Sequence, residues 1–210
     1  MNYSVVIVAA GKGIRANLGY NKNFFEIEEG KTIIDKTIDI FDEDIECQEI
    51  IVVTDKDNID SINKRNKIKI ILGGETRKDS VYNGLKEVKE DYVLIHDGVR
   101  PFLRKESLEK LKDNLNKYDA LILAHNVVET VKYVEDNKII KTINRNNIYL
   151  AETPQAFKTS LILKAYEISV DKEFTDEAML LEEIGENVYI VEDEYPNPKL
   201  TKAEDFKIND

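Results

Sequence analysis

Two kinds of hydrophobic pattern alternate along this chain. Short runs of β-branched and other apolar residues predict buried strands, and the segments between them, such as residues 32–41, 78–88 and 105–116, have apolar residues at helical spacing. Strands that alternate with helices are typical of an α/β fold, in which a mostly parallel sheet carries helices on both faces. The predicted strands lie at residues 3–9, 49–54, 68–72, 92–96, 120–124 and 188–191.

Residues 126–149 interrupt this alternation. Their sequence, NVVETVKYVEDNKIIKTINRNNIY, has two stretches of alternating apolar and polar residues around a polar turn at 135–138, which predicts a protruding β-hairpin. Apolar residues left over on one face of such an arm would pair well with a second copy, so we expect a homodimer. No low-complexity linker or repeat of fixed period divides the chain, and we expect one domain over residues 1–210 with 126–149 as its β-arm.

Composition and charge argue against several classes of protein. With 30 Lys and Arg against 41 Asp and Glu, the net charge is -11, which argues against nucleic-acid binding because that function needs a basic surface. No apolar run approaches the about 20 residues of a membrane span, and no secretory leader is recognisable, so we expect a cytoplasmic protein without a membrane partner. One cysteine and two histidines argue against a closed zinc site. Any metal is expected to be Mg²⁺, held by carboxylates and a substrate phosphate.

The loop that follows the first predicted strand, in VVIVAAGKGIRANLGYNK at residues 5–22, has two readings. Gly11, Gly13 and Ala16 formally satisfy the Gly-x-Gly-x-x-Gly/Ala fingerprint of dinucleotide-binding proteins. The residues after the glycines are poor helix formers, however, and the acid about 20 residues further on, Asp35, falls inside a predicted helix instead of at a strand end. The Walker pattern is absent as well. A dinucleotide-dependent dehydrogenase is therefore a remote alternative.

Basic residues in the same loop favour the second reading, a loop that holds a triphosphate. Lys12, Arg15 and Lys22 could bring up to three positive charges to one anion. Small residues at the strand end would let backbone N–H groups approach phosphate oxygens closely. The structural alternative is that these are solvated loop charges.

Two further motifs place polar residues at predicted strand ends. In GGETRKDSVYNGL, residues 73–85, a glycine pair ends a strand and a helix begins where its N–H groups favour anions, although a simple helix cap is the alternative. In VLIHDGVRPF, residues 93–102, Asp97 can bind Mg²⁺ and Arg100 can bind phosphate or a neighbouring carboxylate. His96 is expected to be a half-buried structural residue and not a base.

Two signals near the end of the chain are less specific. In FTDEA, the residues from Thr175 to Glu177 read first as a helix N-cap followed by acids in the first turn, although a direct site role is possible. Lys199, in PNPKLT, follows a proline and precedes the end of the chain, where a purely structural role is harder to assign.

Taken in order, these motifs resemble a known family. AAGKGIR, Lys22, GGETRKDSV, HDGVRPF, NRNN, TPQAF, TDEA and PKLT, which span nearly the whole chain, resemble the cytidylyltransferases of the 2-C-methyl-D-erythritol 4-phosphate type. The resemblance implies a nucleotidyltransferase domain with a Rossmann-like sheet, a homodimer with exchanged arms, and Mg²⁺-dependent transfer of CMP from CTP to a polyol phosphate with release of pyrophosphate. Ribitol 5-phosphate cytidylyltransferases share most of these motifs, so ribitol 5-phosphate or another polyol phosphate is the alternative acceptor. An inactive nucleotide-binding protein is a more remote alternative.

The resemblance also implies roles for individual positions. It assigns catalysis at the α-phosphorus to Arg15, Lys22 and Lys199, and metal binding to Asp97. The positions implied for CTP binding are Ala9, Ala10, Gly11, Gly13, Gly74, Glu75, Ser80 and Gly98. Those implied for substrate binding are Asp97, Arg100, Thr130, Thr153, Thr175 and Arg145, the last contributed by the partner's arm.

The chain departs from the family pattern at a few positions. The family usually has Pro-Lys-Gln where this chain has Asn21, Lys22 and Asn23, which predicts a less rigid loop around the lysine. Val99 matches the residue found at this position in the ribitol 5-phosphate enzymes. On the arm, the chain has Val128 and Glu129 where a basic residue and Asp are common in the family. Conversely, RKDSV and NRNNIYLAETPQAF favour methylerythritol 4-phosphate as the acceptor.

Overall fold

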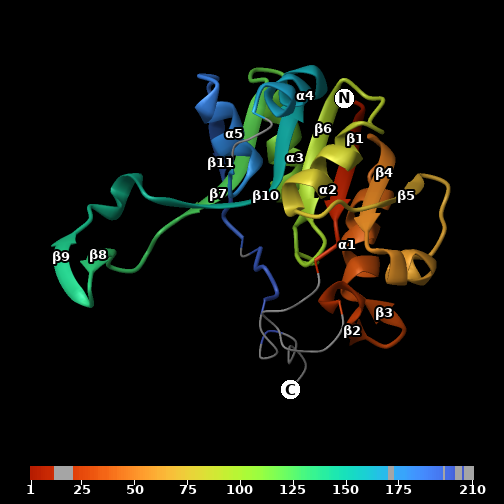
Figure 1. Cartoon of the computed structure of the whole chain (residues 1–210), viewed down its shortest axis with the longest axis horizontal. Helices are drawn as coiled ribbons and strands as arrows, with labels where there is room; N and C mark the ends of the chain where they lie inside the picture. Colours follow the sequence, from red (N-terminus) through yellow and green to blue (C-terminus); the bar gives the residue numbers. More distant parts are fainter. Residues whose placement is uncertain (12–20, 170–172, 196, 202–204, 206–210) are drawn as a thin grey trace.

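The computed structural model describes residues 1–11, 21–169, 173–195, 197–201 and 205. In this part of the chain, a seven-stranded sheet has the order β11-β7-β10-β6-β1-β4-β5 (Figure 1). Its strands are parallel to their neighbours except β10, which runs antiparallel to both β6 and β7. Their bounds are β1 (Tyr3–Val8), β4 (Cys47–Thr54), β5 (Ile68–Leu72), β6 (Tyr92–Asp97), β7 (Ala120–Asn126), β10 (Tyr149–Lys158) and β11 (Tyr189–Glu192).

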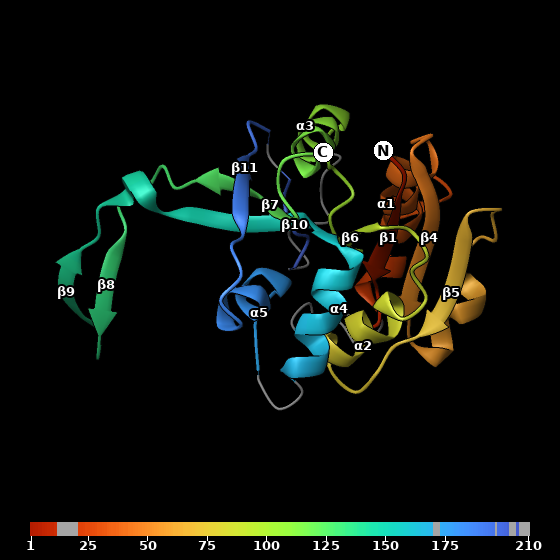
Figure 2. The same cartoon turned by 90° about the horizontal axis from the view of Figure 1, so that it is seen from above.

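Helices cover both faces of the sheet, as the alternation of patterns predicts. Strand β1 is apolar on both sides, so Val5 and Ile7 pack into one core while Val6 packs into the other. The first core lies under α1 (Ile33–Asp42) and α3 (Lys105–Leu115). The second lies under α2 (Arg77–Leu85), α4 (Thr159–Ile168) and α5 (Glu177–Glu183), and Figure 2 shows the two groups of helices on opposite sides.

The predicted strands and the three predicted helices are confirmed, with their ends shifted by a few residues. The elements that were not predicted include β10 and α4, as well as the short strands β2 (Glu26–Glu28) and β3 (Lys31–Thr32). Strand β10 contains Glu152, Thr153 and Gln155 around a proline, so it lacks the apolar alternation that identifies a strand. Helix α4 follows it directly. No helix in the described ranges is both long and apolar enough to cross a membrane.

The protruding hairpin is present but shorter than predicted. Strands β8 (Lys132–Glu135) and β9 (Lys138–Thr142) are joined by Asp136 and Asn137, whose φ angles are +46° and +62°. Two consecutive residues with positive φ are typical of the tight turns that match the twist of a hairpin. The outer parts of 126–149 belong instead to β7, to β10 and to the short helix η4 (Arg145–Asn147). The hairpin extends far from the main sheet, as Figure 1 shows.

Candidate active site

A pocket of about 430 Å³ opens beyond the C-terminal ends of β1 and β6 and beside the start of α2. This is the edge where ligands of open parallel sheets bind. Five residues that were not among the predicted site residues also contribute to its wall: Val8, Asn23, Thr76, Arg77 and Val99. The predicted residues that line it are Ala10, Gly11, Lys22, Gly74, Glu75, Ser80, Asp97 and Lys199. Gly13 and Arg15 lie outside the described residues.

The glycine pair after β5 allows the chain to pass close to the start of α2. A Cβ atom at Gly73 would lie 2.6 Å from Cβ of Ala10, and one at Gly74 would collide with Asp79. The N–H of Gly74 donates to Oγ of Ser80 at 3.1 Å, and that hydroxyl donates to the carbonyl of Thr76 at 2.8 Å. The cap of α2 is therefore built into the pocket wall, so the helix-cap interpretation and the predicted site are compatible.

Asp97, the last residue of β6, is the most strongly perturbed carboxylate of the pocket. Its Oδ2 lies 2.7 Å from Nζ of Lys199 and 3.5 Å from Nε of Arg100, and its Oδ1 lies 3.9 Å from Nη2 of Arg77. Burial alone would raise the pKa of Asp97, but these three cations outweigh burial and lower the pKa to about 2. Asp97 is therefore a fixed negative charge surrounded by cations.

Arg77, the first residue of α2, is a pocket cation that the sequence motifs did not single out as a site residue. Its guanidinium forms two parallel bonds to the fully buried carboxylate of Glu177, at 2.8 and 3.1 Å. The hydroxyl of Tyr166 donates to the same carboxylate at 3.0 Å. A bidentate pair of this kind fixes the plane of the guanidinium, so α5 determines how Arg77 faces the pocket.

Lys22 and Lys199 approach the pocket from segments far apart in the chain. Nζ of Lys22 donates to the carbonyl of Leu200 at 2.9 Å. The N–H of Leu200 donates to the carbonyl of Val99 at 3.0 Å, which holds the segment around Lys199 against the loop after β6. Two of the three predicted catalytic cations are thus brought to one side of the pocket.

Behind Asp97, a buried hydrogen-bond chain orients the end of β6. The backbone N–H of Asp97 donates to Oγ1 of Thr153 at 3.1 Å, and this hydroxyl donates to Nδ1 of His96 at 3.1 Å. Nε2 of His96 donates to the carbonyl of Arg100 at 3.1 Å. Burial lowers the pKa of His96 to about 4, so the ring is neutral and serves as a connector, although it is fully buried and not half-buried as expected.

Three of the predicted residues support the pocket from outside its lining. Ala9 is buried and Gly98 donates its N–H to the carbonyl of Val8 at 3.0 Å. The side chain of Arg100 turns inward and donates from Nη1 to the carbonyl of Asn197 at 2.5 Å. The direct contacts with CTP or the acceptor that the resemblance implies for these three residues stay predictions.

The remaining predicted residues are not among those that line the pocket of their own chain. Thr130 and Arg145 are exposed on the arm, where the guanidinium of Arg145 donates to the carbonyl of Val128. Thr175 is exposed just before α5, whose N-cap is Asp176, with Oδ1 accepting from the N–H of Met179 at 3.0 Å. The motif does begin a helix, as its N-cap interpretation predicts, but the cap is Asp176 instead of Thr175 and Glu177 is the acid of the first turn.

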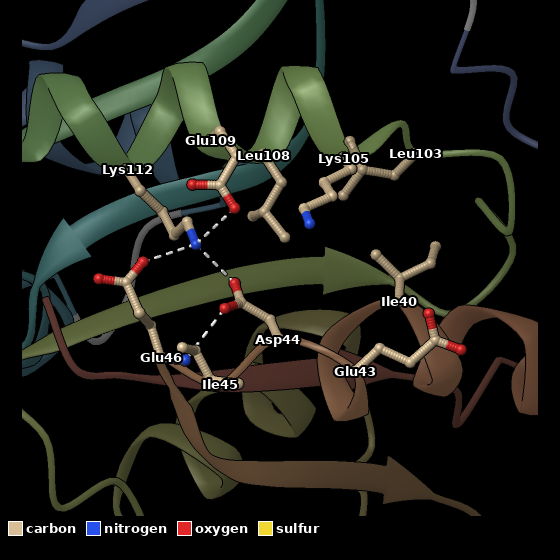
Figure 3. Close-up of a pocket in the computed structure, with 10 residues that line it drawn as sticks. All are labelled: Ile40, Glu43, Asp44, Ile45, Glu46, Leu103, Lys105, Leu108, Glu109 and Lys112. Carbon is tan, nitrogen blue, oxygen red and sulfur yellow. Dashed lines mark hydrogen bonds and ion pairs between the residues drawn. The ribbon is translucent and has the colours of Figure 1, made fainter.

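A larger cavity, of about 520 Å³, lies between α1, α3 and the loop before β4 (Figure 3). The ammonium of Lys112, only 4% exposed, points toward three carboxylates, those of Asp44 and Glu46 at 2.7 Å and that of Glu109 at 3.0 Å. These ion pairs connect α3, which carries Lys112 and Glu109, with the loop before β4, which carries Asp44 and Glu46. The protein's own carboxylates therefore already surround the ammonium of Lys112. None of the predicted site residues lines this cavity.

The pocket at the strand ends offers few ligands to a metal. Within the described ranges, no group of three or more His, Cys, Asp or Glu side chains is placed to hold an ion. Mg²⁺ commonly binds through one or two carboxylates together with substrate phosphates and water. The ionised carboxylate of Asp97, in a pocket that Lys22 and Lys199 also line, fits that mode.

Comparisons with known proteins agree along almost the whole chain. A profile of the family described as "IspD: 2-C-methyl-D-erythritol 4-phosphate cytidylyltransferase" matches residues 3–210. A protein of that name from Clostridioides difficile is 42% identical over 217 residues, covering 98% of this chain and 91% of the relative. One from Geobacillus thermodenitrificans is 40% identical over 216 residues, covering 98% and 94%.

Solved structures give the same result. The crystal structure of a 2-C-methyl-D-erythritol 4-phosphate cytidylyltransferase from Francisella tularensis matches with a TM-score of 0.84 and 35% identity, covering 98% of this chain and 97% of the other. The 4-diphosphocytidyl-2C-methyl-D-erythritol synthase from Anaerococcus prevotii matches with a TM-score of 0.86 and 33% identity, covering 98% and 92%.

Proposed function

The chain belongs to the 2-C-methyl-D-erythritol 4-phosphate cytidylyltransferase family, and on this premise we propose how its pocket carries out the reaction. The enzyme transfers CMP from CTP to 2-C-methyl-D-erythritol 4-phosphate in the non-mevalonate route to isoprenoid precursors. One observation carries the proposal: Lys22, Asp97 and Lys199 meet at one pocket beside the glycine pair.

The types of residue in the pocket suit this chemistry. The acceptor is already a phosphate anion, so the enzyme needs no general base to create a nucleophile. An acceptor oxygen forms a bond to the α-phosphorus of CTP while the bond to the β-phosphate breaks, and pyrophosphate leaves with that electron pair. The barrier comes from bringing two anions together and from charge on the reacting phosphorus, so positioning and fixed cations are the main contributions that a protein can make.

Lys22 and Lys199 are assigned to these cationic roles. Both line the pocket, and hydrogen bonds or ion pairs hold both ammonium groups on one side of it. Arg77, which is held by Glu177, adds a further positive charge to the wall. The family resemblance gives Arg15 a third catalytic role at the triphosphate.

Asp97 is the residue that would hold Mg²⁺, together with phosphate oxygens of the substrates. When bound, the ion would neutralise negative charge on the phosphates. Lys199 and Arg100 keep the carboxylate of Asp97 ionised and in place for this role. Cytidine is assigned to the small residues Ala9 to Gly11, to Gly74 and Glu75, and to Ser80 and Gly98.

We propose that the active enzyme is a homodimer in which the arm of one protomer completes the pocket of the other. Tyr133, Val134, Ile139 and Ile140 are between 46% and 59% exposed on the arm, which is more apolar surface than a solvated hairpin needs. Arg145 on the same arm would then reach the acceptor phosphate of the partner's pocket. The cytoplasmic location and the absence of nucleic-acid or membrane partners stay predictions of the sequence.

An assay of pyrophosphate release tests the proposed acceptor. The purified enzyme is incubated with CTP, Mg²⁺ and in turn 2-C-methyl-D-erythritol 4-phosphate, ribitol 5-phosphate and other polyol phosphates. We expect turnover with the first and little with the others. Equal turnover of ribitol 5-phosphate would favour the alternative acceptor, for which Val99 in the pocket wall is the supporting observation. Binding of CTP without pyrophosphate release from any acceptor would instead favour an inactive nucleotide-binding protein.

A further inference from the structure

The two asparagines that flank Lys22 are buried. Asn21 is 7% exposed and Asn23 is 3% exposed, although Asn23 and Lys22 line a polar pocket. The family pattern given above has proline and glutamine at these positions. Buried amides require hydrogen-bond partners, so their contacts indicate what they do.

Asn21 gives the backbone the conformation that a proline would impose. Its φ angle is −70°, within the range to which a proline ring restricts the chain, and its ψ angle is 114°. Its Oδ1 accepts from the N–H of Asn23 at 3.1 Å and so caps the short helix η2 (Lys22–Phe24). A side-chain cap therefore takes the place that the ring has in the family pattern, while the expectation of a less rigid loop around Lys22 stays a prediction.

Asn21 also anchors the loop to two strand ends. Its Nδ2 donates to the carbonyl of Ala9, directly after β1, at 2.7 Å, and to Oδ2 of Asp55, directly after β4, at 2.8 Å. Since β1 and β4 are neighbours in the sheet, one amide group connects the start of η2 to the ends of two adjacent strands.

Asn23 provides an anchor on the other side of Lys22. Its Nδ2 donates to Oδ1 of Asn21 at 2.8 Å and lies 3.3 Å from the carbonyl of Ala9. Its Oδ1 packs on Gly98, where a Cβ atom would lie only 2.5 Å from this oxygen. This oxygen has no hydrogen-bond partner among the described residues, so Asn23 contacts the end of β6 by close packing against Gly98.

We propose that Asn21 and Asn23 are positioning residues that together hold the ammonium of Lys22 at the pocket. The pair fixes the backbone on both sides of the lysine to the ends of β1, β4 and β6, so that little freedom remains to be lost when the two phosphate substrates bind. The proposal rests on the catalytic role proposed for Lys22. Neither asparagine is assigned a contact with the reacting atoms.

A double-mutant cycle on kcat tests this proposal. Asn21→Ala and Asn23→Ala are made in the wild-type enzyme and in a Lys22→Ala enzyme, and pyrophosphate release is measured at saturating CTP and 2-C-methyl-D-erythritol 4-phosphate. We expect each asparagine variant to lower kcat roughly 10- to 100-fold in the wild type, as a misplaced catalytic group does. In the Lys22→Ala enzyme the same substitutions should change kcat less than about twofold, because the residue on which they act is gone.

Restoration of the family pattern provides a rescue. Asn21→Pro combined with Asn23→Gln keeps the φ angle of residue 21 and an amide at residue 23, and should bring kcat to within roughly threefold of the wild type. Asn114→Ala is the matched control, since the side chain of Asn114 donates to the carbonyl of Lys110 on α3, outside the pocket. It should leave kcat unchanged in both enzymes.

The outcomes separate the two proposals. If Lys22→Ala turns over at the wild-type rate, the catalytic role of Lys22 is wrong and the positioning role falls with it. If Lys22→Ala is slow but the asparagine variants cause the same loss in both enzymes, or the Pro-Gln double variant is as slow as Asn21→Ala, only the positioning role is wrong.

Discussion

Nζ of Lys199 lies 2.7 Å from Oδ2 of Asp97, so the segment before the C-terminus closes on the end of the central strand β6. This contact matters because Asp97 is almost completely buried. Burial by itself would raise the pKa of Asp97, and the nearby cations, Lys199 first among them, lower it to about 2. The charge on a predicted metal ligand therefore depends on a predicted catalytic lysine.

Lys199→Met should change both the rate and its pH dependence. Loss of this cation should lower kcat by about 10²–10³, as for other preorganised charges at a reacting centre. It should also raise the pKa of Asp97. The acid limb of the pH–rate profile should therefore move to higher pH. The measurement is a pH–rate profile with Lys105→Ala as control. Profiles of the same shape for the variant and the wild type would contradict the coupling of Lys199 to Asp97.

Lys22→Ala should lower kcat by about 10²–10³ without unfolding the enzyme. Its ammonium lies in the pocket and is bonded to the carbonyl of Leu200, so the loss should appear in turnover more than in the Tm. Lys64→Ala, at an exposed position outside the pocket, is the control in the same assay. A Lys22→Ala enzyme with the wild-type rate would refute the role assigned to Lys22.

Glu177→Ala should destabilise the fold strongly. The carboxylate of Glu177 is completely buried between Arg77, Tyr166 and the first turn of α5. Its removal leaves the guanidinium of Arg77 with only the more distant carboxylate of Asp97 at 3.9 Å. Breaking a fully buried pair costs about 3–5 kcal/mol, and the cost is smaller here because Arg77 is partly exposed. Urea unfolding measures this, with the exposed Glu182→Ala on the same helix as control. Equal stability of the two variants would show that the pair is not needed for folding.

The neutral state of His96 predicts a loss of stability in acid. Its pKa is lowered to about 4 in the fold by burial, compared with about 6.5 in an unfolded chain. Between these values the unfolded chain binds the additional proton, so the free energy of unfolding falls as the pH falls from about 6.5 to 4, by about 3 kcal/mol. Urea unfolding at pH 7 and at pH 4.5 should reveal this loss in the wild type and a smaller one in His96→Gln. The same decrease in both proteins would contradict the assignment to His96.

The proposed exchange of arms predicts that two inactive variants complement each other. Lys22→Ala should inactivate the pocket that its own protomer forms, and Arg145→Ala should inactivate the pocket that its arm completes in the partner. A mixed dimer contains one pocket with an intact body and the intact arm of its partner, so random mixing should restore roughly a quarter of the wild-type rate. Pyrophosphate release is measured after the two proteins are unfolded and refolded together, and each variant refolded alone is the control. No gain in rate on mixing would mean that the arm of Arg145 does not complete the partner's pocket.

The local pattern of the sequence determined most of the elements and the chemistry of the pocket. Strand β1 is recognisable because Val5, Val6 and Ile7 must be buried on both faces, and α1 because its apolar residues share one face. Small residues and charges that follow predicted strands also predicted the pocket, because parallel strands present their C-terminal ends at one edge. These inferences need only the periodicity of neighbouring residues.

Tertiary structure alone decided which distant groups meet. Strand β10 lies between β6 and β7 in the sheet, and its polar sequence does not predict this position. The contacts of Arg77 with Glu177 and of Asn21 with Asp55 join elements whose separation in space depends on strand order and helix packing. Such contacts have no signal within a window of a few residues, because a side chain finds its partner only after the sheet has brought the two segments together.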